Sequence, residues 1–429
     1  MVVKSKSPVT RASGQKPVSD IRRLIPELGL KEYWYPAIEA QKVKKKPIGM
    51  KLLGEQLVFF NGKDGNVAAL WNVCPHRGGS LMHGDSHFEG TVSCPYHGWT
   101  FGGDGNVLAV LPEGPESKIP GKVKARVYPT QTLRGMVFVW MGEGEPAPIE
   151  EDVPPEFFRE DGIMMYASEV WPVNWRQAVE NAADAHVPYV HRDAMLVLMN
   201  PMFQRGPVGV RSKIVNGRGA PSTPPQPKKS DDGIEEAPKF ESRYRHYFPE
   251  LNRTWPKHWW RGVWTWAFKW SGRRRYKKKP LYENEEWLSN GGRSLHHTPA
   301  MVRLDYRTHL YTRANVPIDQ SNTRQMYIHY ARGTNLLGRL YEKLNFHLWH
   351  RWAMYSNFSV QDFRAAGPQV YDSTEYLSAT DSHLVVVRRM FANARGLKKQ
   401  DTEITPAEEF SHDRQRETGM VPADWRESV

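Results

Sequence analysis

The two cysteines of this chain each lie close to a histidine, in two short motifs that resemble one another. The first motif reads C-P-H-R-G from Cys74 to Gly78, and the second reads C-P-Y-H-G-W from Cys94 to Trp99. Two thiolates and two imidazoles are enough ligands for a metal centre. Because the ligands come from two separate loops, the chain has to fold so that these loops meet. This requirement predicts a small domain with paired loops around residues 74–99.

Two kinds of metal centre compete for this ligand set of Cys74, His76, Cys94 and His97. Zinc accepts two cysteines and two histidines, but finger spacings usually pair cysteine with cysteine and histidine with histidine. Here each loop supplies one residue of each type. A Rieske [2Fe-2S] cluster, with both cysteines on one iron and both histidines on the other, fits this spacing better. The alternative without any metal is that the two cysteines are buried core residues and that the histidines lie beside them by chance.

The chain around these motifs has the pattern of β-strands. An apolar run over 51–60 is followed by an Asn-Gly and Asp-Gly turn and then by a second run over 67–71, which predicts a hairpin. An Asp104-Gly105 turn separates two further runs, and another apolar strand is expected over 136–141. We therefore predict an all-β domain over 32–150, after an N-terminal tail over 1–31.

The remainder of the chain mixes helix and strand patterns. Helices are expected over 174–191, 336–352 and 378–399, and two or three strands over 294–332. A segment around 203–290 begins rich in Pro, Gly, Ser and Lys and is predicted to be an insertion. We assign 151–400 to a second domain and 401–429 to a C-terminal tail.

The Cys-His motifs resemble those of the terminal oxygenase components of Rieske non-heme iron oxygenases. The segments Tyr33–Pro36, Lys51–Glu55 and Asn174–Arg176 are similar to the homotrimeric branch that includes carbazole dioxygenase. The likeness covers about 32–193 and returns around 361–392. It implies an α+β chain, in which an all-β Rieske domain precedes a catalytic domain whose antiparallel sheet wraps around a helix (helix-grip).

The resemblance also implies a mononuclear Fe(II) site. His186 and His191 lie five residues apart on a predicted helix that Pro188 interrupts, so both imidazoles can converge on one ion. A carboxylate would complete a facial triad with open positions for O2. Asp362 is the candidate, because Gln361-Asp362 resembles the Q-D element that supplies the third ligand in the family.

Two further residues are assigned by resemblance. In the family, an aspartate just before the first histidine connects that ligand to a cluster histidine of the neighbouring subunit. Asp184 is the candidate here, although it stands two residues before His186 rather than the usual three. Glu180 is the alternative bridge. Asn181 resembles a residue that lies near the iron without a firm bond.

Charge and composition bear on partners and location. The net charge is +12, and the cations Lys42 and Lys44–Lys46 would suit an acidic ferredoxin as electron donor, itself reduced by an NAD(P)H-dependent reductase. The Trp-rich and basic segment over 255–279 is interpreted as a pocket wall and subunit contact followed by a solvated loop, with peripheral membrane contact less favoured and nucleic acid excluded. With two cysteines, no apolar run long enough to span a membrane and no secretory h-region, a cytoplasmic location is expected.

These features together predict a homotrimeric terminal oxygenase that uses O2 to hydroxylate a bulky hydrophobic substrate, such as an aromatic, terpenoid or steroid. O- or N-demethylation and cis-dihydroxylation require the same residues and stay open. A Rieske protein that only transfers electrons is the alternative from another class, and a zinc-stabilised interaction module is the more distant one.

Overall fold

The computed structural model describes the following residues: 21–183, 186–191, 194, 211–223, 229–230, 233–234, 285–287, 294–306, 309–332, 335–371, 373, 375–377 and 381–397. The C-terminal tail, the segment 255–279 and Asp184 lie outside the described residues. Within the predicted N-terminal tail, Ile21, Ile25 and Leu30 are buried in the core of the protein. The domain boundaries as a whole stay a prediction.

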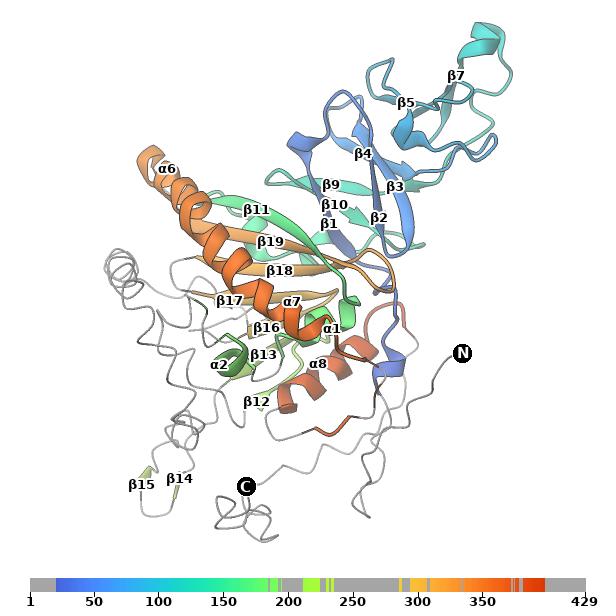
Figure 1. Ribbon diagram of the computed structural model, residues 1–429. Coiled ribbons are helices and arrows are strands. Elements are labelled where there is room, and N and C mark those ends of the chain that lie inside the picture. The colour runs from blue at the N-terminus through green and yellow to red at the C-terminus, as the bar shows by residue number, and fades with distance from the viewer. Residues whose placement is uncertain are drawn as a thin grey trace.

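The N-terminal part is an all-β lobe built from three antiparallel sheets, which confirms the predicted fold class for this region (Figure 1). The first sheet orders β1 (Trp34–Glu39), β10 (Met136–Trp140) and β9 (Thr130–Leu133). The second orders β2 (Ile48–Leu52), β3 (Glu55–Asn61), β4 (Val67–Trp71) and β8 (Val127–Tyr128). The third consists of β5 (Thr91–Ser93), β6 (Trp99–Gly102) and β7 (Val107–Val110).

The predicted strand over 51–60 is two strands instead of one. Leu53 and Gly54 both have positive φ angles, of 47° and 82°, and form the turn between β2 and β3. Residues with positive φ cannot continue a strand, and glycine adopts such angles without strain. The apolar pattern alone concealed this turn because Leu52 and Leu53 are both buried.

The C-terminal part is built on one antiparallel sheet of seven strands. Their order is β11 (Gly162–Trp171), β19 (Thr323–Arg332), β18 (Leu310–Pro317), β17 (Met301–Asp305), β16 (Ser294–His297), β13 (Gly219–Thr223) and β12 (Arg211–Ser212). The region 294–332 therefore holds four strands, where two or three were predicted. The additional turn falls at 298–300, between β16 and β17.

A long helical run crosses one face of this sheet (Figure 1). It consists of α6 (Leu336–Asn345), the wide π-type helix η11 (Phe346–Ser359) and α7 (Val360–Ala366). Phe346, Met354 and Tyr355 of η11 pack in one cluster with Tyr311 and Tyr327 of the sheet. This packing of a helix on an antiparallel sheet confirms the predicted architecture of the catalytic region.

The predicted helix over 174–191 is interrupted. α1 (Trp175–Glu180) begins at Asn174, whose side chain caps it, and α2 (Val187–Val190) follows as a single turn. After Glu180 the backbone N–H groups of Ala182 and Ala183 bond three residues back, which tightens and ends the helix. The predicted C-terminal helix is shorter than expected and forms α8 (Ser382–Ala392).

The helix predicted from the apolar spacing over 336–352 forms, but its apolar stripe is not buried by the described residues. Leu336 is 83% exposed, Leu337 78% and Leu348 77%. The helical spacing therefore established the helix without establishing which face meets the sheet. Within the part of the chain that is described, every helix is too short or too polar to cross a membrane.

Candidate metal centres

The two Cys-His loops have matching backbone geometry. The Cys74 N–H donates to the Gly79 carbonyl at 2.8 Å, and the Cys94 N–H donates to the Trp99 carbonyl at 2.8 Å. In each loop the glycine four residues after the cysteine donates back to the cysteine carbonyl. Both of these glycines, Gly78 and Gly98, have positive φ. The loops are therefore two copies of one tight turn, with the histidine placed two or three residues after the cysteine.

Thiols and imidazoles are separated by depth in this site. Cys74 and Cys94 are buried and form no disulfide, whereas His76 is exposed and His97 is half-buried. The two imidazole rings lie 4.7 Å apart between centroids. Burial raises the pKa of the Cys74 thiol to about 11, so a thiolate at this depth needs a cation beside it. The imidazoles are therefore the part of this site that another molecule could approach.

Replacing His97 by cysteine should keep a cluster but lower its reduction potential by on the order of 100 mV or more. The added thiolate carries a negative charge and stabilises the oxidised state. Potentiometric titration of the visible spectrum measures this shift. His87→Cys, at an exposed histidine of the same domain, is the matched control and should change nothing. An unchanged potential in His97→Cys would show that His97 is not a ligand.

The second predicted site comes together from two distant parts of the chain. His186 and His191 flank α2, and Asp362 lies on α7. The Asp362 Oδ1 atom accepts from His186 Nε2 at 3.1 Å and from His191 Nε2 at 2.7 Å. These ligand atoms lie within 4.8 Å of one another. The structure thus brings the three residues together as the sequence predicted, while their role as ligands stays a prediction.

The spacing of these atoms fits one cation. Neighbouring ligands at about 2.1 Å from a metal are separated by about 3 Å when they are at right angles, which matches both measured separations. Two imidazoles and one carboxylate on one face are the donor set of non-haem Fe(II) sites. Asp362 is 1% exposed. Burial opposes its charge, but the hydrogen bonds from His186 and His191 outweigh burial and hold the Asp362 pKa below its usual range.

Three further residues around this site were not predicted from the sequence. Gln361 Oε1 lies 3.2 Å from His191 Nδ1 and can orient that ring. Phe358 stacks on the His191 ring at 3.6 Å between centroids. The Arg313 guanidinium of β18 lies 3.7 Å from Asp362. The sequence identified Gln361 only as part of the Q-D element with Asp362 and gave no role for it, and nothing in the sequence points to Arg313.

The structure describes only some of the residues that were assigned by resemblance to the route between the two metal centres and to the surroundings of the iron. Asn181 follows α1 as its C-cap and is half-buried, and its predicted role stays a prediction. Glu180 is buried, and both of its oxygens are bonded to Arg388 within the same chain, with Tyr371 as a further donor. Glu180 is therefore occupied by a structural ion pair, which argues against its alternative role as a bridge. Asp184 lies outside the described residues.

The ion pair of Glu180 fastens α1 to α8 and predicts a stability effect. Arg388→Met leaves the buried carboxylate without its partner and should cost roughly 3–5 kcal/mol of unfolding free energy. Chemical denaturation followed by circular dichroism measures this loss. Arg389→Met, one residue along the same helix and less buried, should cost far less. Equal stabilities of the two variants would contradict the structural role of the pair.

Comparison with known proteins agrees with the architecture. The model of the Rieske [2Fe-2S] domain matches residues 33–128, and that of the homotrimeric ring hydroxylases matches residues 140–211. The terminal oxygenase component of carbazole 1,9a-dioxygenase from Metapseudomonas resinovorans is 34% identical over 194 residues, which is 45% of this chain and 49% of the relative. The oxygenase subunit of phthalate 4,5-dioxygenase from Pseudomonas putida is 33% identical over 186 residues, covering 42% of this chain and 40% of the relative.

Solved structures extend the likeness to most of the fold. The terminal oxygenase of carbazole 1,9a-dioxygenase from Nocardioides aromaticivorans IC177 has a TM-score of 0.65 at 23% identity and covers 88% of this chain and 98% of that chain. A reduced complex between oxygenase and ferredoxin of carbazole 1,9a-dioxygenase gives 0.62 at 21% identity, over 87% and 92%. The sequence alignments, by contrast, span about half the length of the curated relatives.

Residues 33–128 are therefore a Rieske [2Fe-2S] domain, as the two Cys-His motifs predicted. The chain joins this domain to a region of the homotrimeric ring hydroxylase type. Its relatives are Rieske oxygenases, among them terminal oxygenase components of carbazole dioxygenase, and this confirms the resemblance inferred from the sequence.

Proposed function

We propose that this protein is the terminal oxygenase of a multicomponent Rieske oxygenase system. One observation carries the proposal, namely that a single chain holds both the paired Cys-His loops and a buried cluster of two histidines and one aspartate. The first site has the ligands for an electron-carrying cluster, and the second has those of an oxygen-activating Fe(II). The same observation argues against a Rieske protein that only transfers electrons, because such a protein has no need of the second site.

The chain's own residues prepare the second site for iron. When bound there, the iron would supply the position at which O2 is activated for attack on an organic substrate. His186, His191 and Asp362 would hold this iron. Asp362 supplies the negative charge, and the ring of Phe358 covers His191 on one face.

The substrate we propose is a bulky hydrophobic molecule, such as an aromatic, terpenoid or steroid. The face of the sheet that meets the long helix carries aromatic and apolar side chains, including Tyr311 and Tyr327, which pack with Tyr355 of that helix. Tyr327 and Tyr355 stack at 4.0 Å between centroids, which is the kind of contact that a flat apolar molecule makes with an aromatic side chain. Hydroxylation is the reaction proposed; demethylation and cis-dihydroxylation use the same metal ligands.

Electrons would come from a ferredoxin that an NAD(P)H-dependent reductase reduces. One of the structures with this fold is described as an oxygenase–ferredoxin complex. In this chain Lys44–Lys46 are exposed on the Rieske lobe and would attract an acidic donor. Because this partnership operates in the cytoplasm, where two free cysteines also remain reduced, we place the protein there.

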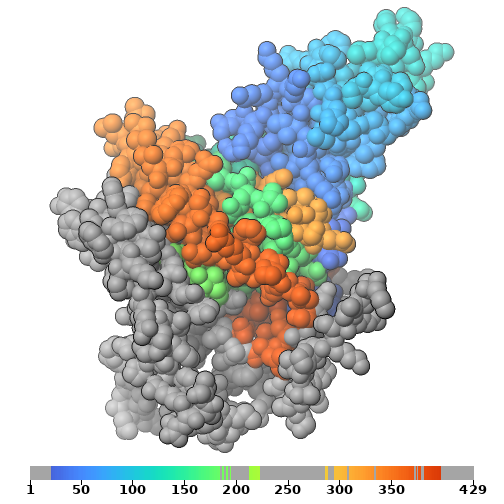
Figure 2. Space-filling view, viewed as in Figure 1, coloured from blue at the N-terminus to red at the C-terminus, as the bar shows by residue number. Residues whose placement is uncertain are grey.

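A homotrimer forms part of the proposal. The sheet β5–β7, which carries the Cys94 loop, lies at the tip of the N-terminal lobe, far from α7 with its Asp362 (Figures 1 and 2). Electron transfer across this span within one chain would be slow. In a ring of three chains, the tip of one lobe can approach the iron site of its neighbour. The match to homotrimeric ring hydroxylases over residues 140–211 supports this arrangement.

The proposal is tested by reconstituting the purified protein with ferredoxin, reductase and NADH, and supplying a panel of hydrophobic candidates under 18O2. We expect a product that carries 18O and consumption of O2 that depends on substrate. Iron analysis should give about three irons per chain, two for the cluster and one for the triad. A protein with about two irons per chain and no 18O-labelled product would support the electron-transfer alternative.

A further inference from the structure

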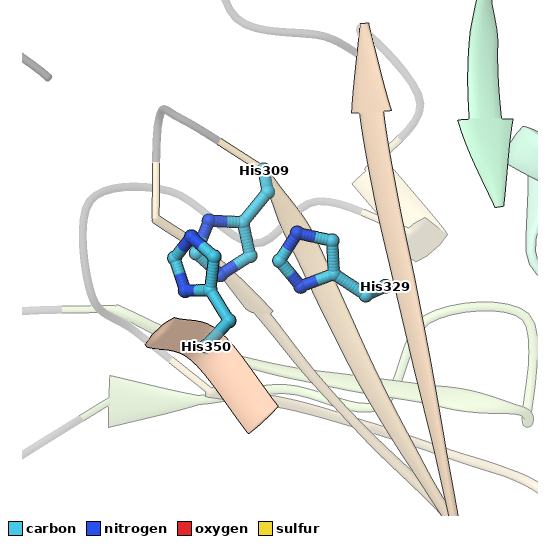
Figure 3. A group of neighbouring side chains, drawn as sticks. All are labelled: His309, His329 and His350. Carbon is cyan, nitrogen blue, oxygen red and sulfur yellow. The ribbon is translucent and has the colours of Figure 1, made fainter. Parts of the chain in front are cut away.

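Three histidines from separate elements meet between the sheet and the long helix (Figure 3). His309 directly precedes β18, His329 lies on β19, and His350 lies on η11. One ring nitrogen of each lies within 4.8 Å of a ring nitrogen of the other two. The rings of His309 and His329 stack at 4.0 Å between centroids, and the ring of His350 lies 4.4 Å from that of His309.

The hydrogen bonding of His329 and His350 is incomplete in a way that points to a cation. His329 is fully buried, and neither of its ring nitrogens has a hydrogen-bond partner among the described residues. The Nδ1 atom of His350 likewise has none. Buried polar atoms are nearly always satisfied, and a neutral imidazole always offers one lone pair. Lone pairs that are gathered in a buried space without hydrogen-bond donors can be satisfied by a shared metal ion.

The side chain of Asn345 can hold His350 in the orientation that metal binding requires. Its amide lies 3.0 Å from His350 Nε2. If the Asn345 amide is rotated by about 180°, its oxygen faces His350 and accepts a hydrogen bond from Nε2–H. The Nδ1 atom of His350 then carries the free lone pair that a metal needs. A hydrogen bond of this kind on the far nitrogen is the usual way in which ligating histidines are oriented.

We propose that His309, His329 and His350 form an additional, independent metal site that binds a divalent ion of the zinc class. Imidazoles without a carboxylate select zinc, copper or nickel over magnesium or calcium. Three protein nitrogens leave a fourth position open for water or another small ligand. Nitrogens bound at about 2.1 Å are separated by about 3.4 Å in a tetrahedral site, so the rings must close by roughly 1 Å. The stacked rings of His309 and His329 must also tilt, so that the in-plane lone pairs of both rings point at one ion.

The protonation state of the three rings suits this role. Burial is the largest influence on each of them and lowers the pKa of His309 and His329 well below the ordinary value, and that of His350 to about 4. At neutral pH the rings are therefore uncharged, which is the form that binds metals. The cluster does not have to lose a proton before it accepts an ion.

The site is separate from the iron triad. His350 precedes Asp362 by twelve residues on the helical run η11–α7, which corresponds to roughly three turns of helix. The two clusters therefore bind ions independently of one another. The inference does not depend on the oxygenase proposal, because it rests on the three histidines alone.

The test uses the full-length protein with His191→Ala, which disables the triad and leaves the three histidines intact. After dialysis against a weak chelator, the protein is titrated with zinc sulfate and the bound metal is measured by mass spectrometry. We expect about one tightly bound zinc per chain. The X-ray absorption spectrum at the zinc edge should show three imidazole nitrogens at about 2.0–2.1 Å. Iron does not contribute to the spectrum at this edge.

Two further substitutions, each made in the His191→Ala protein, test whether the zinc is bound by the three histidines. His350→Ala and His309→Gln should each weaken zinc binding by more than about 100-fold, because each removes a direct ligand. His347→Ala, three residues before His350 and exposed on the same helix, is the matched control and should bind zinc like its parent. The absorbance of the Rieske cluster and the size of the assembly verify that each variant is folded.

Zinc binding that survives both substitutions in folded protein would overturn the site. So would a parent protein that binds no zinc, or one whose spectrum shows fewer than three imidazoles. Since the spectrum is recorded on the parent, the inference remains testable even if both variants fail to fold.

Discussion

Replacing His191 by alanine is expected to remove the mononuclear iron and abolish oxygenation while leaving the Rieske cluster intact. His191 is fully buried, and its Nε2 atom lies 2.7 Å from the Asp362 carboxylate. Without this ligand the triad is reduced to one imidazole and one carboxylate, too few to retain Fe(II). Iron should fall from about three to about two per chain. Labelled product should fall to background, while the visible and EPR signals of the cluster remain.

The matched control for this experiment is His347→Ala, at an exposed histidine of η11. It should retain the full iron content and full activity. Loss of the cluster signal together with the iron would indicate general unfolding, and then His186→Gln, at a less buried position, distinguishes the two cases. A His191→Ala protein with about three irons and full turnover would show that the triad assignment is wrong.

Replacing Asp184 by asparagine is expected to slow electron transfer from the reduced cluster to the iron site on the order of 100-fold. The carboxylate is predicted to connect His186 to a cluster histidine of the neighbouring chain. Asparagine fills the same volume and still accepts a hydrogen bond, but it carries no charge to stabilise a histidine that becomes positive. Rapid mixing of reduced protein with substrate and O2, followed at the cluster absorbance, measures the rate. Both metals and the trimer should be retained.

Glu180→Gln is the control variant for this experiment. Glu180 is bonded to Arg388 in the core of its own chain, so this substitution should affect stability more than electron transfer. A normal reoxidation rate in Asp184→Asn would refute the bridging role of Asp184. A defect confined to Glu180→Gln would instead mean that the ion pair opens in the trimer to release this carboxylate.

The loops of the Rieske site were predictable because their chemistry is local. Each cysteine and its histidine lie within three residues of each other, and the glycines that close the turns are part of the same motifs. The strands that carry the loops followed from apolar runs and Asn-Gly or Asp-Gly turns. The exception was the turn at Leu53-Gly54, where the buried Leu52 and Leu53 made the apolar run look continuous.

The second site was only partly predictable. His186 and His191 could be paired because they lie on neighbouring turns, and Asp362 was assigned through the resemblance to known oxygenases. Arg313 was missed, because its approach to Asp362 depends on how β18 packs beneath α7. The helix over 174–191 was predicted as continuous, whereas the chain turns after Glu180 and places His186 and His191 on either side of a single helical turn.

The sequence by itself determined the class of this protein, since the cluster motifs need only a tight turn and a few neighbouring residues. Tertiary structure alone decided which distant side chains share a site. His309, His329 and His350 are separated by about twenty residues each and follow no period, yet strand pairing and the helix that crosses the sheet bring them together. Strand register and helix rotation set such meetings, and both are fixed by the packing of the whole domain rather than by any short stretch of chain.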